Sequence, residues 1–110
     1  MIMPLVGLLL GLTVGWLLPV SMPLEYAKYM SVALMAGMDS VLGGVRSSFE
    51  DKYDNKIFIT GFFSNTLLAV IITYIGERLF IDLYFVAILT FGIRMFRNIA
   101  LIRRYILKKQ

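Results

Sequence analysis

Two long stretches of the sequence contain no charged residue: residues 1–24 and residues 57–76. A helix needs about 20 apolar residues to cross a bilayer, and it satisfies its backbone hydrogen bonds without help from water. Each stretch is long enough for one crossing. This feature predicts an integral membrane protein built from helices, an all-α fold.

The composition supports this prediction. Hydrophobic residues make up 59% of the 110 residues and charged residues 16%, whereas a soluble domain carries about 25% charged residues. A soluble chain of this length could not hide so much apolar surface, so lipid or other subunits must cover it. We expect a single transmembrane domain, residues 1–110, that associates with copies of itself.

Several kinds of catalytic site are excluded by residue type. The sequence contains no cysteine and no histidine, so it has no disulfide, thiolate metal site, cysteine nucleophile or His-based triad. The acidic residues of loop 47–56 match no calcium-loop spacing and are interpreted as solvated. We therefore expect no enzyme activity, no metal and no cofactor.

Prolines and polar residues divide the chain into four predicted helices. Pro4 and Pro23 suit helix starts, and Pro19 marks an end. Residues 21–23 are predicted as a tight turn, and residues 47–56 as the main polar loop. The predicted helices are 4–18, 24–46, 57–79 and 83–107.

The distribution of Lys and Arg predicts the orientation. A four-span arrangement with both termini inside leaves only Lys28 and Arg78 outside, and basic residues favour the cytoplasmic side. The alternative is three spans with the C-terminal segment lying as an amphipathic helix in the interface. The residues placed inside by the four-span arrangement are Arg46, Lys52, Lys56, Arg97, Arg103, Arg104, Lys108 and Lys109.

Small residues recur every four positions on two of the predicted helices. Such ridges let two helix backbones approach closely and gain contacts that lipid does not provide. Packing within one subunit is one interpretation, and a subunit interface through the first helix is the other. The ridges are Gly7, Gly11 and Gly15 on the first helix, and Ala36, Ser40 and Gly44 on the second.

Polar residues inside the predicted spans fall at one depth. Charges at that depth are costly, so they normally pair or line water. We expect Asp39 to pair with Arg94 or Arg97, as a structural salt bridge or as a site for an ion, headgroup or polar substrate. Arg97 could instead extend to the interface. The polar layer comprises Asp39, Asn65, Arg94, Arg97 and Asn98.

Basic residues also crowd the C-terminus. Beside a membrane helix such a cluster is typical of contact with anionic headgroups, and no module for nucleic-acid binding accompanies it. We therefore expect lipid rather than nucleic acid as the partner. The cluster comprises Arg103, Arg104, Lys108 and Lys109.

Four segments together resemble a known family. They are residues 39–46 (DSVLGGVR), 60–65 (TGFFSN), 82–84 (DLY) and 91–104 (FGIRMFRNIALIRR). With the glycine-rich first helix, they resemble the small basic protein family of bacterial membrane proteins. The resemblance implies the cell membrane of a Gram-positive-type bacterium and genes near those for division and the envelope. It implies no biochemical activity.

Three functions remain open from the sequence, and the third and weakest of them is an intramembrane enzyme or a lipid-binding factor. The first is a non-enzymatic, oligomeric scaffold or accessory subunit of the bacterial envelope, with a possible membrane protein partner. The second is a small transporter or channel subunit whose polar layer lines a path. Asp39 discriminates between the first two, because it is paired and dry in a scaffold and faces continuous water in a pore.

Overall fold

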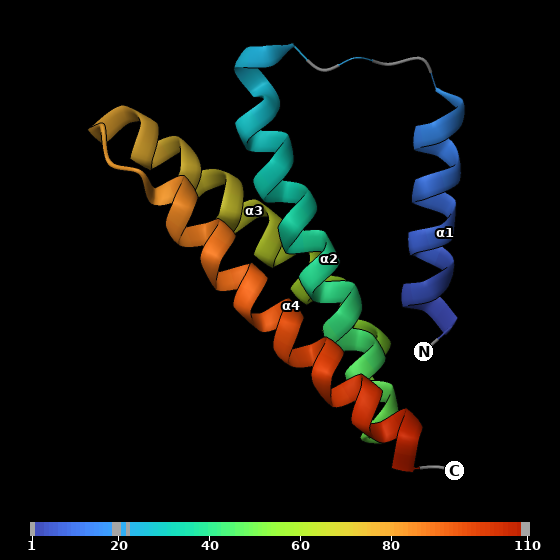
Figure 1. The fold of residues 1–110 in the computed structure, drawn as a ribbon. Helices are drawn as coiled ribbons and strands as arrows, with labels where there is room; N and C mark the ends of the chain where they lie inside the picture. Colours follow the sequence, from blue (N-terminus) through green and yellow to red (C-terminus); the bar gives the residue numbers. More distant parts are fainter. Residues whose placement is uncertain (1, 19–20, 22, 109–110) are drawn as a thin grey trace.

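The computed structural model of the chain describes residues 2–18, 21 and 23–108 (Figure 1). The fold is all-α, as predicted, with four α-helices and one 3₁₀ turn in these residues. The elements are α1 (Ile2–Leu17), η1 (Leu24–Tyr26), α2 (Ala27–Phe49), α3 (Asn55–Leu79) and α4 (Leu83–Lys108). Three parts of the sequence predictions lie outside the described residues: Pro19, Met22 and Lys109.

The helix bounds differ from the predicted ones around the loop between α2 and α3. The α2 helix continues past Arg46 to Phe49, so the loop is shorter than expected. The α3 helix begins at Asn55 because Asp54 caps it: its carboxylate accepts the backbone N–H of Lys56 and Ile57 at 2.8 and 3.3 Å. A residue predicted to be a solvated loop charge is therefore a helix cap.

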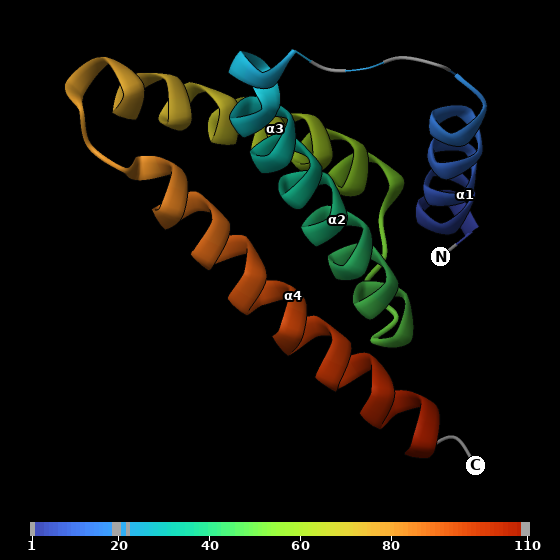
Figure 2. The same ribbon diagram turned by 45° about the horizontal axis from the view of Figure 1, so that its top comes forward.

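Helices α2, α3 and α4 form a bundle with its own core. The α3 and α4 helices make a hairpin, and α2 lies against both of them (Figures 1 and 2). The buried core side chains are mostly small, which lets the helix axes come close. They are Val32, Ala36, Ala69, Ala87 and Phe91.

The α1 helix stands apart from this bundle. In Figures 1 and 2 it runs beside α2, but it does not pack along α2 as α3 and α4 do. Only Pro4 of α1 is buried, while Leu9, Leu12 and Trp16 are 64%, 64% and 89% exposed. The sequence did not predict this separation.

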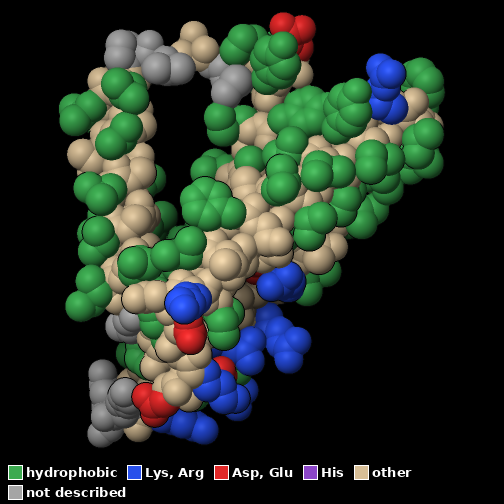
Figure 3. Space-filling model, turned by 180° about the vertical axis from the view of Figure 1, so that it is seen from behind, with side chains coloured by type: hydrophobic (Ala, Val, Ile, Leu, Met, Phe, Trp, Pro, Cys, Tyr) green, Lys and Arg blue, Asp and Glu red, His purple; other side chains and the backbone are tan. Residues whose placement is uncertain are grey.

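The two ends of the molecule differ in charge. Both termini lie at the end that carries the α2–α3 loop (Figure 1), and Lys and Arg side chains gather there (Figure 3). We call this the basic end. Lys28 and Arg78 lie at the opposite end, near the α3–α4 turn.

Two of the helices, α3 and α4, are long and apolar enough to cross a membrane, judged by length and composition. The α1 helix is apolar but shorter, at 16 residues. The helices also leave many large hydrophobic side chains exposed on their outer faces, as the green surface in Figure 3 shows.

Candidate functional site

A buried carboxylate meets an arginine between the core and the basic end. Arg94 Nη2 on α4 lies 3.3 Å from Asp39 Oδ2 on α2. The Asp39 side chain is 0% exposed, whereas that of Arg94 is 54% exposed. Of the two expected partners, Arg94 is within ion-pair distance. Arg97 is exposed and makes no ion pair with the described residues.

The contact between Asp39 and Arg94 is an ion pair without a hydrogen bond. Neither carboxylate oxygen of Asp39 accepts a hydrogen bond from any described protein atom. A guanidinium can give a carboxylate two parallel hydrogen bonds, but here no N–H of Arg94 is aligned with it. The carboxylate therefore keeps its full acceptor capacity.

A cavity of about 200 Å³ lies beside this pair, and we call it the polar cavity. Ser40 Oγ and the Tyr53 hydroxyl are also buried without a hydrogen-bond partner among the described residues. Every side-chain atom with that property in the described chain belongs to a residue that lines the polar cavity. Its main polar lining residues are Asp39, Ser40, Ser47, Lys52, Tyr53, Asp54, Asn65 and Arg94.

Glycines and a tight loop create this space. Gly43, Gly44 and Gly61 line the cavity. A Cβ at Gly61 would meet no atom within 4 Å, so this position of α3 leaves room, whereas Gly44 lets Phe58 approach α2 closely. Asp51 has a left-handed backbone, with φ of 58°, and turns the chain directly after α2. The turn brings Tyr53 back against the bundle, where its ring lies 6.0 Å from that of Phe58.

Asn98 belongs to a different cluster from Asp39, Asn65 and Arg94, the members of the predicted polar layer that line the polar cavity. It is buried, and its Oδ1 accepts a hydrogen bond from Arg46 Nη1 at 3.2 Å. Arg46 Nε also donates to Glu50 Oε2 at 3.2 Å, and the Tyr105 hydroxyl donates to the same oxygen at 2.6 Å. We call these four residues the basic-end network. They tie the last turn of α2 to α4.

Glu50 was predicted to be a solvated loop charge, but it is half-buried within the basic-end network. The hydrogen bond from Tyr105, followed by that from Arg46, lowers the pKa of the Glu50 carboxyl below its ordinary value. The sequence signal for this role was weak: one tyrosine among the basic residues of the C-terminal segment.

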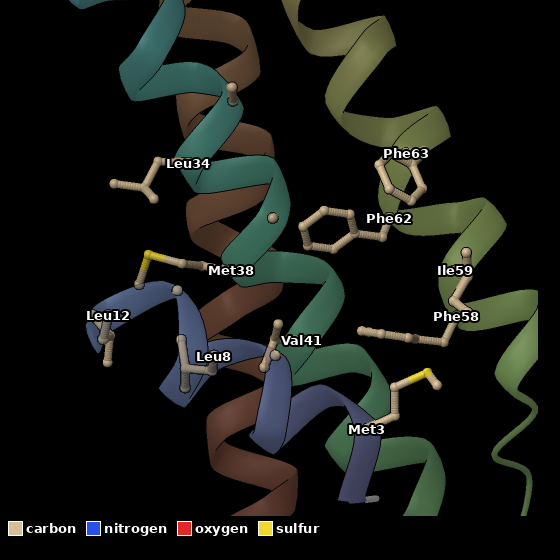
Figure 4. A pocket seen from close by; sticks show the side chains of 14 residues that line it. Met3, Leu8, Leu12, Leu34, Met38, Val41, Phe58, Ile59, Phe62 and Phe63 are labelled. Atoms are coloured by element: carbon tan, nitrogen blue, oxygen red, sulfur yellow. The ribbon is translucent and has the colours of Figure 1, made fainter. Parts of the chain in front are cut away.

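An apolar groove of about 430 Å³ separates α1 from the bundle. Phe58 and Phe62 of α3 point toward α2 on one side, while Leu8 and Leu12 lie on α1 on the other (Figure 4). The lining residues are Met3, Gly7, Leu8, Gly11, Leu12, Ala33, Leu34, Gly37, Met38, Val41, Phe58, Ile59, Phe62 and Phe63. We call this space the apolar groove.

The two ridges of small residues have different surroundings. On α2, Ala36 is buried in the core, and a Cβ at Gly44 would come within 3.0 Å of Phe58 and 3.1 Å of Pro4. On α1, a Cβ at any of the three ridge glycines would meet no atom within 4 Å. The α2 ridge packs within the chain, whereas the α1 ridge is open.

Comparison with known proteins finds a family whose model covers the bundle described above. The model of the family described as "Protein of unknown function (DUF1290)" matches residues 22–107. The chain belongs to this family. The family match includes the polar cavity, the basic-end network and the whole bundle, and it leaves out α1.

Named relatives agree with the membership. A "Small basic protein" of Bacillus subtilis is 41% identical over 107 residues, covering 97% of this chain and 88% of the relative. An uncharacterized protein of Mycobacterium bovis is 34% identical over 100 residues, covering 89% and 83%. The predicted resemblance to the small basic protein family is confirmed. None of these names denotes an enzyme, and no solved structure matches the chain.

Proposed function

We propose that this family member is a non-enzymatic, multi-pass subunit of the bacterial cell membrane that assembles with further copies of itself through α1. The observation that carries the proposal is the open α1 ridge. A Cβ at Gly7, Gly11 or Gly15 would meet no atom of the described chain within 4 Å. Gly7 and Gly11 line the apolar groove, so a partner helix would approach them from the side of that groove.

The surface of the molecule supports the membrane location. Large apolar side chains are exposed along α1, α3 and α4, and such a surface would be covered by lipid or by another subunit. The basic end, with both termini, corresponds to the cytoplasmic side because clustered Lys and Arg favour that side. Exposed side chains of Arg103, Arg104 and Lys108 would contact anionic headgroups there.

The partner that best fits the α1 ridge is α1 of a second copy. In a membrane, helices associate through close packing rather than through the hydrophobic effect, and glycines spaced by four permit that packing. Two copies of the same ridge are complementary to each other across a two-fold axis. The envelope and division context implied by the family resemblance suits such an assembly subunit, with a further membrane protein as a possible partner.

The alternative function is a small transporter or channel subunit, and the position of the core argues against it. Val32, Ala36, Ala69 and Phe91 lie further from the basic end than the polar cavity. None of them lines that cavity, so apolar packing closes its far side. A cavity closed at Asp39 supports a structural or binding role better than a continuous path through one subunit.

Native mass spectrometry after extraction in mild detergent tests the proposal. We expect the wild-type chain to appear as an oligomer and Gly11→Leu to shift toward monomer, because Leu would hold the facing backbones apart. Thr13→Leu is the matched control, since residue 13 lies on the opposite face of α1 from Gly11. A wild-type monomer, or equal oligomers for both variants, would reject assembly through α1.

Orientation has its own test. With no native cysteine, a single Lys108→Cys substitution provides a unique thiol at the basic end. We expect an impermeant thiol reagent to leave it unlabelled in intact cells and to label it after permeabilisation. Labelling in intact cells would place the basic end outside.

A further inference from the structure

We infer that the polar cavity binds a primary ammonium group, with the Asp39 carboxylate as its main acceptor. The inference concerns the space between α2, α3 and α4, and it does not rest on the assembly role of α1. It begins from Asp39, Ser40 and Tyr53, the described residues whose buried side-chain atoms have no hydrogen-bond partner.

The buried oxygens without a partner would be satisfied by a ligand that donates hydrogen bonds. An ionised carboxylate only accepts, through two oxygens with about four lone-pair directions, and both oxygens of Asp39 are free of hydrogen bonds. The hydroxyl of Ser40, the next residue of α2, and the hydroxyl of Tyr53 can accept hydrogen bonds as well. A primary ammonium carries three N–H donors and one positive charge, so it matches a carboxylate flanked by hydroxyls.

Arg94 leaves room for this ligand. Its guanidinium balances the charge of Asp39 but makes no aligned hydrogen bond, and its side chain is more than half exposed. An incoming ammonium can therefore take the hydrogen bonds of Asp39 while Arg94 remains nearby or turns outward.

The remaining charges of the cavity indicate what the ammonium is attached to. Lys52 and Arg94 are basic, and Asp39 and Asp54 are acidic, so the lining has no net charge. A cavity with both signs suits a zwitterion better than a bare cation. The ammonium would reach Asp39, and an anionic group would stay near Lys52 in the α2–α3 loop.

Two sources could supply this chemistry: a small soluble amine or the ethanolamine headgroup of a lipid. The volume of about 200 Å³ fits a small polar group. Phe58 and Phe62 line both the polar cavity and the apolar groove, so an acyl chain could lie beside a bound headgroup. The experiment separates the two sources.

The test uses the full chain in nanodiscs of phosphatidylcholine, whose quaternary ammonium has no N–H donor. Methylammonium chloride is titrated, with tetramethylammonium chloride at equal concentration as the control, and the Tm is measured. We expect methylammonium to raise the Tm by about 5 °C at ten times its Kd, and tetramethylammonium to leave it unchanged. In a second arm, phosphatidylethanolamine replaces part of the phosphatidylcholine, and a rise in Tm there identifies the headgroup as a source.

Variants assign the effect to the cavity. Asp39→Asn could unfold the bundle, so Ser40→Ala and Tyr53→Phe are the informative changes, because neither removes a hydrogen bond within the described chain. We expect each to reduce the Tm shift by half or more. Ser48→Ala is the control: its Oγ donates to the Gly44 carbonyl at 3.0 Å, and the residue does not line the cavity.

Three outcomes would overturn the inference. The first is no shift with either methylammonium or phosphatidylethanolamine. The second is an equal shift with tetramethylammonium, which would indicate a general salt effect. The third is an undiminished shift in both Ser40→Ala and Tyr53→Phe.

Discussion

The α1 helix and the α2–α4 bundle carry the same sequence signal and use it differently. Each contains small residues spaced by four, yet Gly44 on α2 is packed against Phe58 and Pro4, whereas Gly11 on α1 faces open space. A ridge of small residues shows that close helix packing is possible there. It does not show whether the partner comes from the same chain or from another one.

Side-chain hydrogen bonds and ion pairs also distinguish the α2–α4 bundle from α1. The bundle is held at one end by the basic-end network and at the other by Lys28, whose Nζ lies 2.7 Å from Glu77 Oε1. Between α1 and the bundle, no such side-chain hydrogen bond or ion pair is present in the described residues. Polar contacts within the chain therefore fix how α2, α3 and α4 pack together. No such contact fixes the position of α1 among the described residues, so a second chain could provide its packing partner.

The largest effect is expected at Asp39. Asp39→Asn should destabilise the bundle by about 3 kcal/mol, at the lower end of the range for a broken buried pair because Arg94 is partly exposed. Arg94→Gln made together with Asp39→Asn should recover part of this loss. A double-mutant cycle by unfolding in detergent measures the coupling.

Arg97→Gln is the matched control for this cycle. Arg97 lies on the same helix but makes no ion pair in the described chain, so its coupling to Asp39 should be near zero. Equal coupling for Arg94 and Arg97, or none for either, would contradict the pairing.

The next largest loss of stability is expected for a leucine in the α2 ridge, and a much smaller one for a leucine in the α1 ridge. Gly44→Leu should cost about 1–3 kcal/mol or more, since its side chain would overlap Phe58 and Pro4. Gly11→Leu should change the free energy of unfolding of the bundle by no more than about 0.5 kcal/mol, because a Cβ at Gly11 meets no atom within 4 Å and the longer side chain would extend into the apolar groove. Thermal unfolding of both variants at low protein concentration provides the comparison. Similar losses for both would mean that α1 packs inside the subunit.

A smaller effect is expected at the basic-end network. Because the folded-state pKa of Glu50 lies below its unfolded value, its carboxylate stabilises the fold above about pH 4.5. That contribution disappears as the pH falls through the lowered folded pKa. Tyr105→Phe removes the strongest cause of the shift, so this variant should be less stable than wild type at pH 7 and equal to it at low pH.

A pH series of Tm values from 7 down to 3 measures this difference. Tyr74→Phe serves as the control, because Tyr74 is exposed on α3 and lies outside the network. A difference between Tyr105→Phe and wild type that stays constant with pH would indicate lost packing against Phe49 instead, whose ring is stacked on that of Tyr105 at 6.1 Å.

Much of the fold was predictable because apolar runs and prolines mark helices directly. The approach of Asp39 to Arg94 was foreseen as one of two pairings, since helix rise alone puts these residues at similar depth. Tyr53 and Glu50 were not foreseen. Tyr53 is positioned by the left-handed turn at Asp51, and no charge or hydropathy pattern encodes such a turn. Glu50 is positioned by the continuation of α2 past Arg46, which makes it the C-cap of that helix.

The separation of α1 from the bundle was also beyond sequence reasoning. A ridge of glycines has no side chains whose size or polarity could identify its partner. For the same reason, the polar cavity could not be predicted, because glycines line it and at Gly61 an added Cβ would meet no atom within 4 Å.

Cysteine cross-linking tests the central claim most directly, namely that the α1 ridge packs between copies. Gly7→Cys, Gly11→Cys and Gly15→Cys each introduce a single thiol, and a disulfide requires Cα atoms about 4.4–6.8 Å apart. In membranes under mild oxidation, we expect a covalent dimer for at least one ridge position and none for Thr13→Cys. Absence of a dimer at all three ridge positions, or an equal yield at position 13, would contradict the account.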